Sequence, residues 1–199
     1  MTAAALLTAW ALIACGGTKP PPALVDIAAA EPSIVLDIRY ATRNNFTKKI
    51  VYPAAICKLR AEAASALGRA QASLKARGLG LKVYDCYRPL SVQKKFWELV
   101  PDERYVADPK KGSRHNRGMA VDAALVDSAG RELEFPTAYD DFSEKAHRDA
   151  PAWPQAVKNR RLLEEALERE GFRGLPTEWW HFDFRGWEKA PILDAPLIP

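Results

Sequence analysis

Residues 113–122, SRHNRGMAVD, place a polar loop directly before an alternating run of side chains. In residues 119–126 apolar side chains alternate with small or acidic ones, a pattern that predicts a strand. Gly118 allows the backbone to turn tightly, so His115 in the loop and Asp122 in the strand lie near each other. The fold must therefore contain a sheet strand that begins beside an imidazole and carries a carboxylate.

The rest of the chain shows further strand-like and helix-like patterns. The predicted strands span residues 33–40, 79–86 and 178–184, and the predicted helices span residues 55–77, 90–100 and 155–170. An irregular polar loop is expected at 136–154, long enough to have a function. Because helices and strands alternate only loosely, we predict an α+β fold with helices packed on a mainly antiparallel sheet.

Length and composition agree with one globular domain, which we place at residues 33–199. The chain has 199 residues, of which 48% are hydrophobic and 27% charged, enough for one substantial hydrophobic core. Its formal net charge is only +4, from 29 basic and 25 acidic residues that are scattered along the chain. This small excess gives no support for a nucleic-acid partner.

The N-terminus has the character of an export signal. Residues 1–15, MTAAALLTAWALIAC, are too short to span a bilayer but fit the apolar region of a secretory signal. The final LIAC resembles a bacterial lipobox, in which Cys15 becomes the lipidated N-terminus, although no Lys or Arg precedes the apolar run. Residues 16–32 are interpreted as a linker. We expect an exported, periplasmic, lipid-anchored protein, or a cytoplasmic one if residues 1–15 are not a signal.

Two cysteines remain if Cys15 carries lipid. An oxidising compartment permits a disulfide between Cys57 and Cys86. Free buried cysteines are the alternative, since a free cysteine packs well as a small apolar residue. The sequence leaves both possibilities open.

A second histidine completes a set of metal donors. His181 in EWWHFDF joins His115 and Asp122 as two imidazoles and one carboxylate, the usual protein ligands of a catalytic zinc site with one position open for water. Glu178 is then the candidate base. Strict alternation puts Glu178 and His181 on opposite faces of a strand, so we expect Glu178 in the turn after Pro176 or at a bulge. The alternative interpretation is that these His and Asp side chains are ordinary hydrogen-bonded polar groups at strand edges and bind no metal.

Several motifs resemble a known family. SRHNRGMAVD matches the SxHxxGxAxD motif of the zinc D-Ala-D-Ala peptidases, and EWWH matches their ExxH motif. A closer likeness to the D-alanyl-D-alanine dipeptidases of the vancomycin-resistance type adds YATRNNF at 40–46, VYDCYRP at 83–89 and YDDF at 139–142. The likeness covers residues 33 to 187, in one order.

The resemblance implies roles for individual residues. It makes His115, Asp122 and His181 ligands of one Zn²⁺ on the sheet and Glu178 the general base and acid. Arg88 would hydrogen-bond the scissile carbonyl oxygen as that oxygen gains negative charge.

Three further positions follow from the same likeness. Ser113 would bind substrate or shape its loop. Asp140 would pair with the ammonium group of the substrate, with Asp141 as its competitor. Cys86 stands where small residues such as glycine are usual, so it would narrow the site or pair with Cys57.

The resemblance implies a secreted zinc metallopeptidase that hydrolyses the dipeptide D-Ala-D-Ala to two D-alanines. One alternative is a D,D- or L,D-carboxypeptidase that trims peptidoglycan stem peptides in an open cleft. The other is a non-catalytic zinc-binding or cell-wall-binding module. The loop at 136–154 could close the cavity, which favours the dipeptidase. Glycopeptide resistance and D-alanine salvage both remain open as biological roles.

Overall fold

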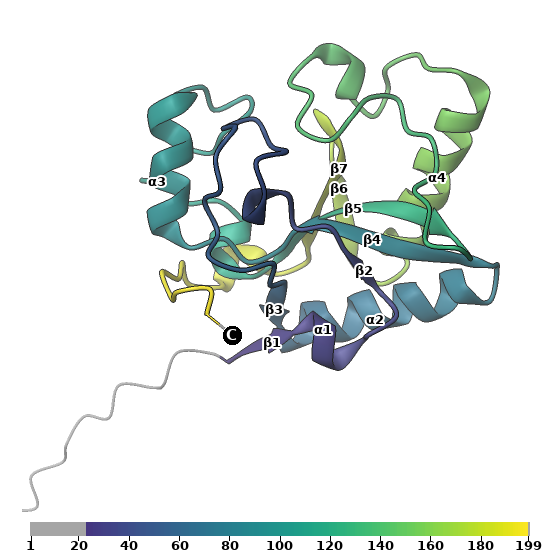
Figure 1. Ribbon diagram of the computed structural model, residues 1–199, viewed down its shortest axis with the longest axis horizontal. Helices are drawn as coiled ribbons and strands as arrows, with labels where there is room; N and C mark the ends of the chain where they lie inside the picture. Colours follow the sequence, from purple (N-terminus) through teal and green to yellow (C-terminus); the bar gives the residue numbers. More distant parts are fainter. Residues whose placement is uncertain (1–22, 199) are drawn as a thin grey trace, which may run out of the picture.

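The computed structural model describes residues 23–198, and the predicted signal segment with Cys15 lies outside this range (Figure 1). Within it, the strands are β1 (Leu24–Asp26), β2 (Val35–Leu36), β3 (Lys58–Arg60), β4 (Leu79–Asp85), β5 (Ala120–Asp127), β6 (Phe172–Leu175) and β7 (Glu178–Phe184). The α-helices are α1 (Ile27–Ala30), α2 (Ala61–Lys75), α3 (Leu90–Leu99) and α4 (Pro154–Glu168). Short 3-10 helices are η1 (Arg39–Ala41), η2 (His115–Arg117), η3 (Glu144–Ala146) and η4 (Trp187–Lys189).

Five strands form the main sheet, in the order β2-β4-β5-β7-β6. The pairs β4–β5, β5–β7 and β6–β7 are antiparallel, and only β2 runs parallel to its neighbour β4. Strands β1 and β3 form a separate antiparallel pair. The prediction of an α+β fold with a mainly antiparallel sheet is confirmed.

Helices α2 and α4 contact each other and the sheet, with α2 running beneath the sheet in Figure 1. The buried side of α2 follows the helical period, with Ala63, Ala66, Leu67, Ala70 and Leu74 all inaccessible to solvent. Helix α3 stands at the other end of the molecule, near the loops that follow η1. Among residues 23–198, no helix has both the length and the hydropathy needed to cross a bilayer.

The predicted linker at 16–32 is wrong in its second half. Residues 24–26 form β1, which pairs with β3, and Ile27 at the start of α1 is only 1% exposed. The side chains of Leu24, Val25 and Ile27 pack against the hydrophobic core. The folded unit therefore begins before residue 33.

Two predicted elements have different boundaries in the structure. The strand predicted at 33–40 is reduced to β2 and is followed by η1. The helix predicted at 55–77 begins only at Ala61, because residues 58–60 pair with β1 instead. Apolar residues at spacings of three and four continue into that stretch, so periodicity alone does not find the boundary.

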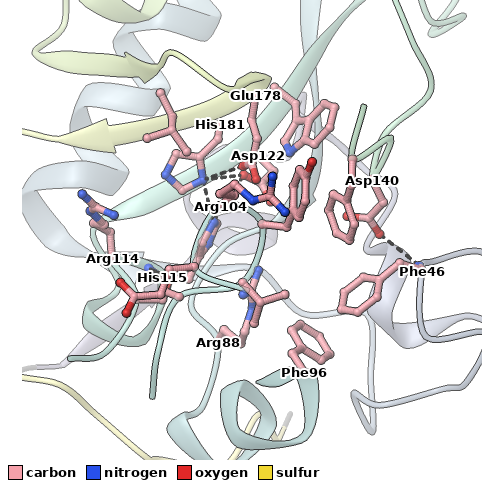
Figure 2. A pocket seen from close by; sticks show the side chains of 18 of the residues that line it. Phe46, Arg88, Phe96, Arg104, Arg114, His115, Asp122, Asp140, Glu178 and His181 are labelled. Carbon is pink, nitrogen blue, oxygen red and sulfur yellow. Dashed lines mark hydrogen bonds and ion pairs between the residues drawn. The ribbon is translucent and has the colours of Figure 1, made fainter. Parts of the chain in front are cut away.

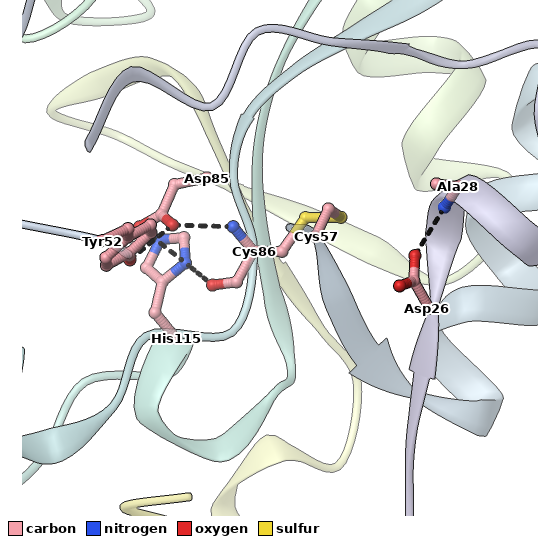
Figure 3. Close-up of a disulfide and its surroundings, with 7 residues drawn as sticks. All are labelled: Asp26, Ala28, Tyr52, Cys57, Asp85, Cys86 and His115. Atoms are coloured by element: carbon pink, nitrogen blue, oxygen red, sulfur yellow. Dashed lines mark hydrogen bonds and ion pairs between the residues drawn. A yellow bond between two sulfur atoms is a disulfide. The ribbon is translucent and has the colours of Figure 1, made fainter. Parts of the chain in front are cut away.

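Cys57 and Cys86 form a disulfide that joins the segment before β3 to the residue after β4 (Figure 3). Their Cα atoms are 5.2 Å apart, and both residues are almost fully buried. The backbone of Cys86 also makes two hydrogen bonds: its N–H donates to the Asp85 carboxylate, and its carbonyl oxygen accepts from the His115 imidazole. The disulfide therefore fixes the end of β4 next to the candidate site.

Candidate active site

His115, Asp122 and His181 converge, with one donor atom from each lying within 4.8 Å of the others. Nδ1 of His181 is 3.0 Å from Oδ1 of Asp122 and 3.1 Å from Nε2 of His115. Asp122 on β5 and His181 on β7 are direct cross-strand neighbours, so their side chains project from the same face of the sheet. All three are buried, and Figure 2 shows them facing one another.

A tight turn positions His115. Gly118 ends η2 in the left-handed conformation, with φ of 65°, and a Cβ atom there would lie 2.7 Å from the Leu24 side chain. Ser113 Oγ accepts a hydrogen bond from the His115 backbone N–H at 3.2 Å, and the Ser113 N–H donates to Asn116 Oδ1 at 2.7 Å. Ser113 therefore shapes the loop, and it also lines the cavity described below.

Each histidine has a second partner on the side away from the other donors. Nδ1 of His115 donates to the carbonyl oxygen of Cys86 at 2.6 Å, which leaves Nε2 facing the site. Nε2 of His181 lies 2.8 Å from Oδ1 of Asp183, which leaves Nδ1 facing the site. Histidines that bind metals usually have such partners, which fix the ring and its tautomer. Asp183 was missed in the sequence, although it follows His181 by two residues on one strand.

Asp122 is held in its charged form. Burial disfavours the carboxylate, but the imidazoles of His115 and His181 keep the pKa of Asp122 well below its usual range. Tyr139 donates its hydroxyl proton to the other carboxylate oxygen, Oδ2, at 2.9 Å. Two imidazoles and an ionised carboxylate fit a catalytic zinc site with three protein ligands.

The β6–β7 pairing explains how Glu178 and His181 reach the same cavity. Gly174 pairs with Phe182 and Leu175 pairs with Glu178, so one step along β6 corresponds to four steps along β7. This irregularity breaks strict alternation. Oε2 of Glu178 consequently lies 3.8 Å from Nδ1 of His181. Of the two placements expected for Glu178, in the turn after Pro176 or at a bulge, the structure has the bulge.

The carboxyl group of Glu178 has an environment suited to proton transfer. Its side chain is only 12% exposed, and this burial raises its pKa to about 8, against the attraction of the His181 imidazole. A carboxyl group with a pKa near neutrality can both accept and release a proton at the working pH.

Arg88 points into the cavity from the turn after β4 (Figure 2). Its guanidinium donates to Oδ2 of Asp85 at 2.7 and 3.1 Å and to Oε1 of Gln93 at 2.8 Å. The group also lies over the ring of Phe96, 4.8 Å from its centre. This is a buried, fixed cation rather than the surface salt bridge that an isolated arginine suggests. Asp85 lies within the VYDCYRP motif, but its role as the partner of Arg88 was not predicted from the sequence.

Asp140, and not Asp141, faces the cavity. Asp140 adopts a left-handed backbone conformation, with φ of 63°, which is uncommon for a residue other than glycine. Its carboxylate accepts hydrogen bonds from the Tyr40 hydroxyl at 3.0 Å and the Phe46 N–H at 3.2 Å, and burial raises its pKa to about 7. Asp141 instead accepts from the Ser143 N–H within its own loop.

The cavity that these groups share is small, about 80 Å³. Aromatic residues form much of its wall, including Tyr40, Phe96, Phe142 and Trp180. The predicted loop at 136–154 contributes Phe142 and Asp140 to the lining of the cavity. Trp179 points elsewhere and stacks on Phe135, with ring centres 4.1 Å apart.

The family model described as Peptidase_M15, D-ala-D-ala dipeptidase, matches residues 22–193. The chain belongs to this family. Its members are metallopeptidases, which is the class that the site geometry indicates. The match begins at residue 22, in agreement with a folded unit that includes β1.

Relatives of this Peptidase_M15 chain include two bacterial D-alanyl-D-alanine dipeptidases. The one from Escherichia coli (strain K12) is 37% identical over 171 residues, which cover 85% of this chain and 89% of the relative. The one from Enterococcus faecalis (strain ATCC 700802 / V583) is 30% identical over 168 residues, covering 73% of this chain and 83% of the relative. A solved structure of VanYB in complex with D-Alanine-D-Alanine matches more weakly, with 19% sequence identity and a TM-score of 0.45. The match covers 69% of this chain and 77% of that chain.

Proposed function

We propose that the protein is a zinc-dependent dipeptidase that hydrolyses D-Ala-D-Ala to two D-alanines. One observation carries this proposal: the three buried metal donors, Glu178 and Arg88 line the same small cavity as Asp140. The relatives named D-alanyl-D-alanine dipeptidase support the choice of substrate.

His115, Asp122 and His181 would hold one Zn²⁺ through the three atoms that face each other. When bound, the ion lowers the pKa of a coordinated water to about 7 and polarises the carbonyl of a substrate. The fixed partners of the two imidazoles keep these donor atoms free for the metal.

Glu178 transfers the proton of the attacking water, and Arg88 stabilises the negative charge that develops on the carbonyl oxygen. Glu178 takes a proton from the attacking water and returns it to the nitrogen of the leaving D-alanine, as its raised pKa allows. Arg88 donates to the carbonyl oxygen as that oxygen becomes negative. Asp85 and Gln93 already fix the guanidinium, so little reorganisation is needed in the transition state.

Asp140 gives the site its preference for a free dipeptide. A substrate with a free N-terminus places an ammonium group in the cavity, and a carboxylate in that wall is the simplest partner for it. A carboxypeptidase for stem peptides would need an open cleft and no such sensor. A purely structural zinc site would close its fourth position with a protein donor.

The first experiment is an amino-acid release assay on the purified protein. D-Ala-D-Ala, N-acetyl-D-Ala-D-Ala and a stem pentapeptide are each offered after chelation, with and without added Zn²⁺. We expect zinc-dependent cleavage of the free dipeptide alone. Cleavage of the blocked or longer substrates would make the protein a carboxypeptidase, and no cleavage of any would favour a binding module.

A variant locates the reaction at the described site. Glu178→Ala should bind Zn²⁺ as the wild type does, because Glu178 is not a proposed ligand, but should lose nearly all turnover. Activity within a few-fold of the wild type would rule out Glu178 as the base.

We also propose export of the protein. The Cys57–Cys86 disulfide supports an oxidising compartment, because disulfides are rare in the cytoplasm of most bacteria. Lipid attachment at Cys15 remains a proposal from the sequence. An exported enzyme fits D-alanine salvage or wall turnover better than resistance, which acts on a cytoplasmic precursor. Metabolic labelling with a fatty-acid analogue, compared between wild type and Cys15→Ser, tests the anchor.

A further inference from the structure

The bulge between β6 and β7 leaves backbone groups that the sheet cannot satisfy. Three residues of β7, from Trp179 to His181, are inserted between the two register pairs that flank the irregularity. A bulge interrupts the ladder of backbone hydrogen bonds, and a buried carbonyl without a donor costs free energy. Some other group must therefore hold the backbone here.

The neighbouring strand does not supply that group for His181. The Phe184 N–H donates to the carbonyl of Met119, the residue just before β5, and hydrogen-bonded and non-hydrogen-bonded pairs alternate along an antiparallel ladder. His181, opposite Asp122, occupies a non-hydrogen-bonded position, so its backbone carbonyl points away from β5 and towards β6. That is the side on which the bulge interrupts the pairing.

Arg148, from the loop before α4, fills the gap. Its Nη2 donates to the His181 carbonyl at 2.8 Å, and its Nε donates to the Leu175 carbonyl at 2.9 Å. The backbone N–H of Arg148 donates to the Pro176 carbonyl at 2.9 Å. One residue thus binds the bulge on both strands and in the turn between them.

The rest of the side chain is fixed as well. The guanidinium lies 4.2 Å from the centre of the Phe182 ring, and Nη1 is 3.5 Å from Oε1 of Glu164 on α4. Only 11% of the side chain is exposed. The Arg148 side chain is therefore packed against the β6–β7 hairpin and is not a mobile surface charge.

We propose that Arg148 is a positioning residue, which fixes the β6–β7 bulge and so holds Glu178 and His181 on the same side of the sheet. The inference rests on the proposed function, because Glu178 and His181 matter only as base and ligand. Arg148 is not among the residues that line the cavity, so it would act through the hairpin and not on the substrate or the metal.

Gly174 supplies an independent observation. A Cβ atom at this position would overlap the guanidinium carbon of Arg148 and lie 2.7 Å from its Nη2. Glycine at the edge of the bulge therefore leaves the space that the guanidinium occupies. Gly174→Ala should displace Arg148 without removing any of its donors.

The test compares four variants by D-Ala-D-Ala turnover, Zn²⁺ affinity and amide hydrogen exchange of residues 172–184. Arg148→Ala and Gly174→Ala each disturb the proposed contact, and the double variant combines them. Glu164→Gln is the matched control, since it removes the ion pair with Arg148 but leaves the donors to the hairpin in place. We expect Arg148→Ala and Gly174→Ala to lower kcat by about 10- to 100-fold, the usual effect of losing a group that orients metal ligands.

The pattern across the variants distinguishes positioning from stability. KM should change less than threefold, exchange of the hairpin amides should accelerate, and Glu164→Gln should match the wild type. The double variant should lose little more than Arg148→Ala, because the added methyl group then meets no guanidinium. If Arg148→Ala does not fold, Gly174→Ala carries the test alone.

Two results would overturn the proposal: a kcat within threefold of the wild type for Arg148→Ala or Gly174→Ala, or an equal loss in Glu164→Gln. Failure of the proposed function is separate, because wild-type protein would then not release D-alanine. In that case hydrogen exchange and Zn²⁺ affinity still decide whether Arg148 fixes the hairpin.

Discussion

Replacing Asp140 by asparagine removes one charge from the cavity and keeps the size of the side chain. Both carboxylate oxygens of Asp140 accept hydrogen bonds, from Tyr40 and Phe46, and asparagine retains one acceptor oxygen. The ammonium group of bound D-Ala-D-Ala would then be buried without its counter-ion. Removing one partner of a buried ion pair costs about 3–5 kcal/mol.

The lower end of that range applies, because Asp140 is only partly buried. Since about 1.4 kcal/mol corresponds to a factor of ten, kcat/KM for D-Ala-D-Ala should fall about 100-fold. The assay is D-alanine release at substrate concentrations well below KM. Asp141→Asn is the matched control, because Asp141 lies in the same loop but accepts a hydrogen bond from the Ser143 N–H and does not line the cavity.

Activity of Asp140→Asn within threefold of the wild type would refute the role of Asp140 as the partner of the ammonium group. An equal loss of activity in Asp141→Asn would refute it as well. A loss that comes with a matching drop in thermal stability would also refute it, because the carboxylate would then support the loop rather than bind the amine.

Three further predictions follow from the same structure. Burial raises the pKa of Asp140 to about 7, and a carboxyl group is charged only above its pKa, so the activity advantage of wild type over Asp140→Asn should shrink as the pH falls from about 8 to about 6. Replacing Cys57 and Cys86 by alanine opens a loop with a sequence separation of 29 residues, and urea denaturation should show an unfolding free energy lower by about 3–4 kcal/mol. Gly118→Ala forces a side chain into the left-handed conformation and against Leu24, so the unfolding free energy should fall by about 1–2 kcal/mol and calorimetric titration should show weaker Zn²⁺ binding.

The sequence predicts elements with a strong hydrophobic period well, and it predicts poorly the short strands that form only through pairing with a distant segment. Residues 119–126 alternate clearly, and they form the central strand β5 almost as predicted. Residues 58–60 carry the same apolar spacing as the helix that follows, yet they pair with β1. Such pairing is a long-range contact, and the local pattern contains no information about it.

The same limit applies to the site. Motifs pointed to the three donors that converge and to Glu178 and Arg88 in the same cavity, because each of the proposed chemical roles demands a particular residue type. The residues that orient them are harder to find, since a carbonyl of Cys86 or a distant Tyr139 can serve only once the chain is folded. Arg148 belongs to this second group, as its targets are backbone carbonyls, which any residue provides.

The charges around the cavity divide into two kinds. Burial disfavours ionisation of Asp122 and Asp183, but neighbouring imidazoles keep the pKa of each below its usual range, so their partners lie within the protein. Burial raises the pKa of Glu178 and of Asp140, whose proposed partners arrive from outside as a proton from water and the ammonium group of the substrate. Sites that separate the pKa values of their carboxyl groups in this way assign them different roles. In the proposed mechanism, Asp122 would be a metal ligand and Asp183 would orient His181, whereas Glu178 and Asp140 would act on the dipeptide.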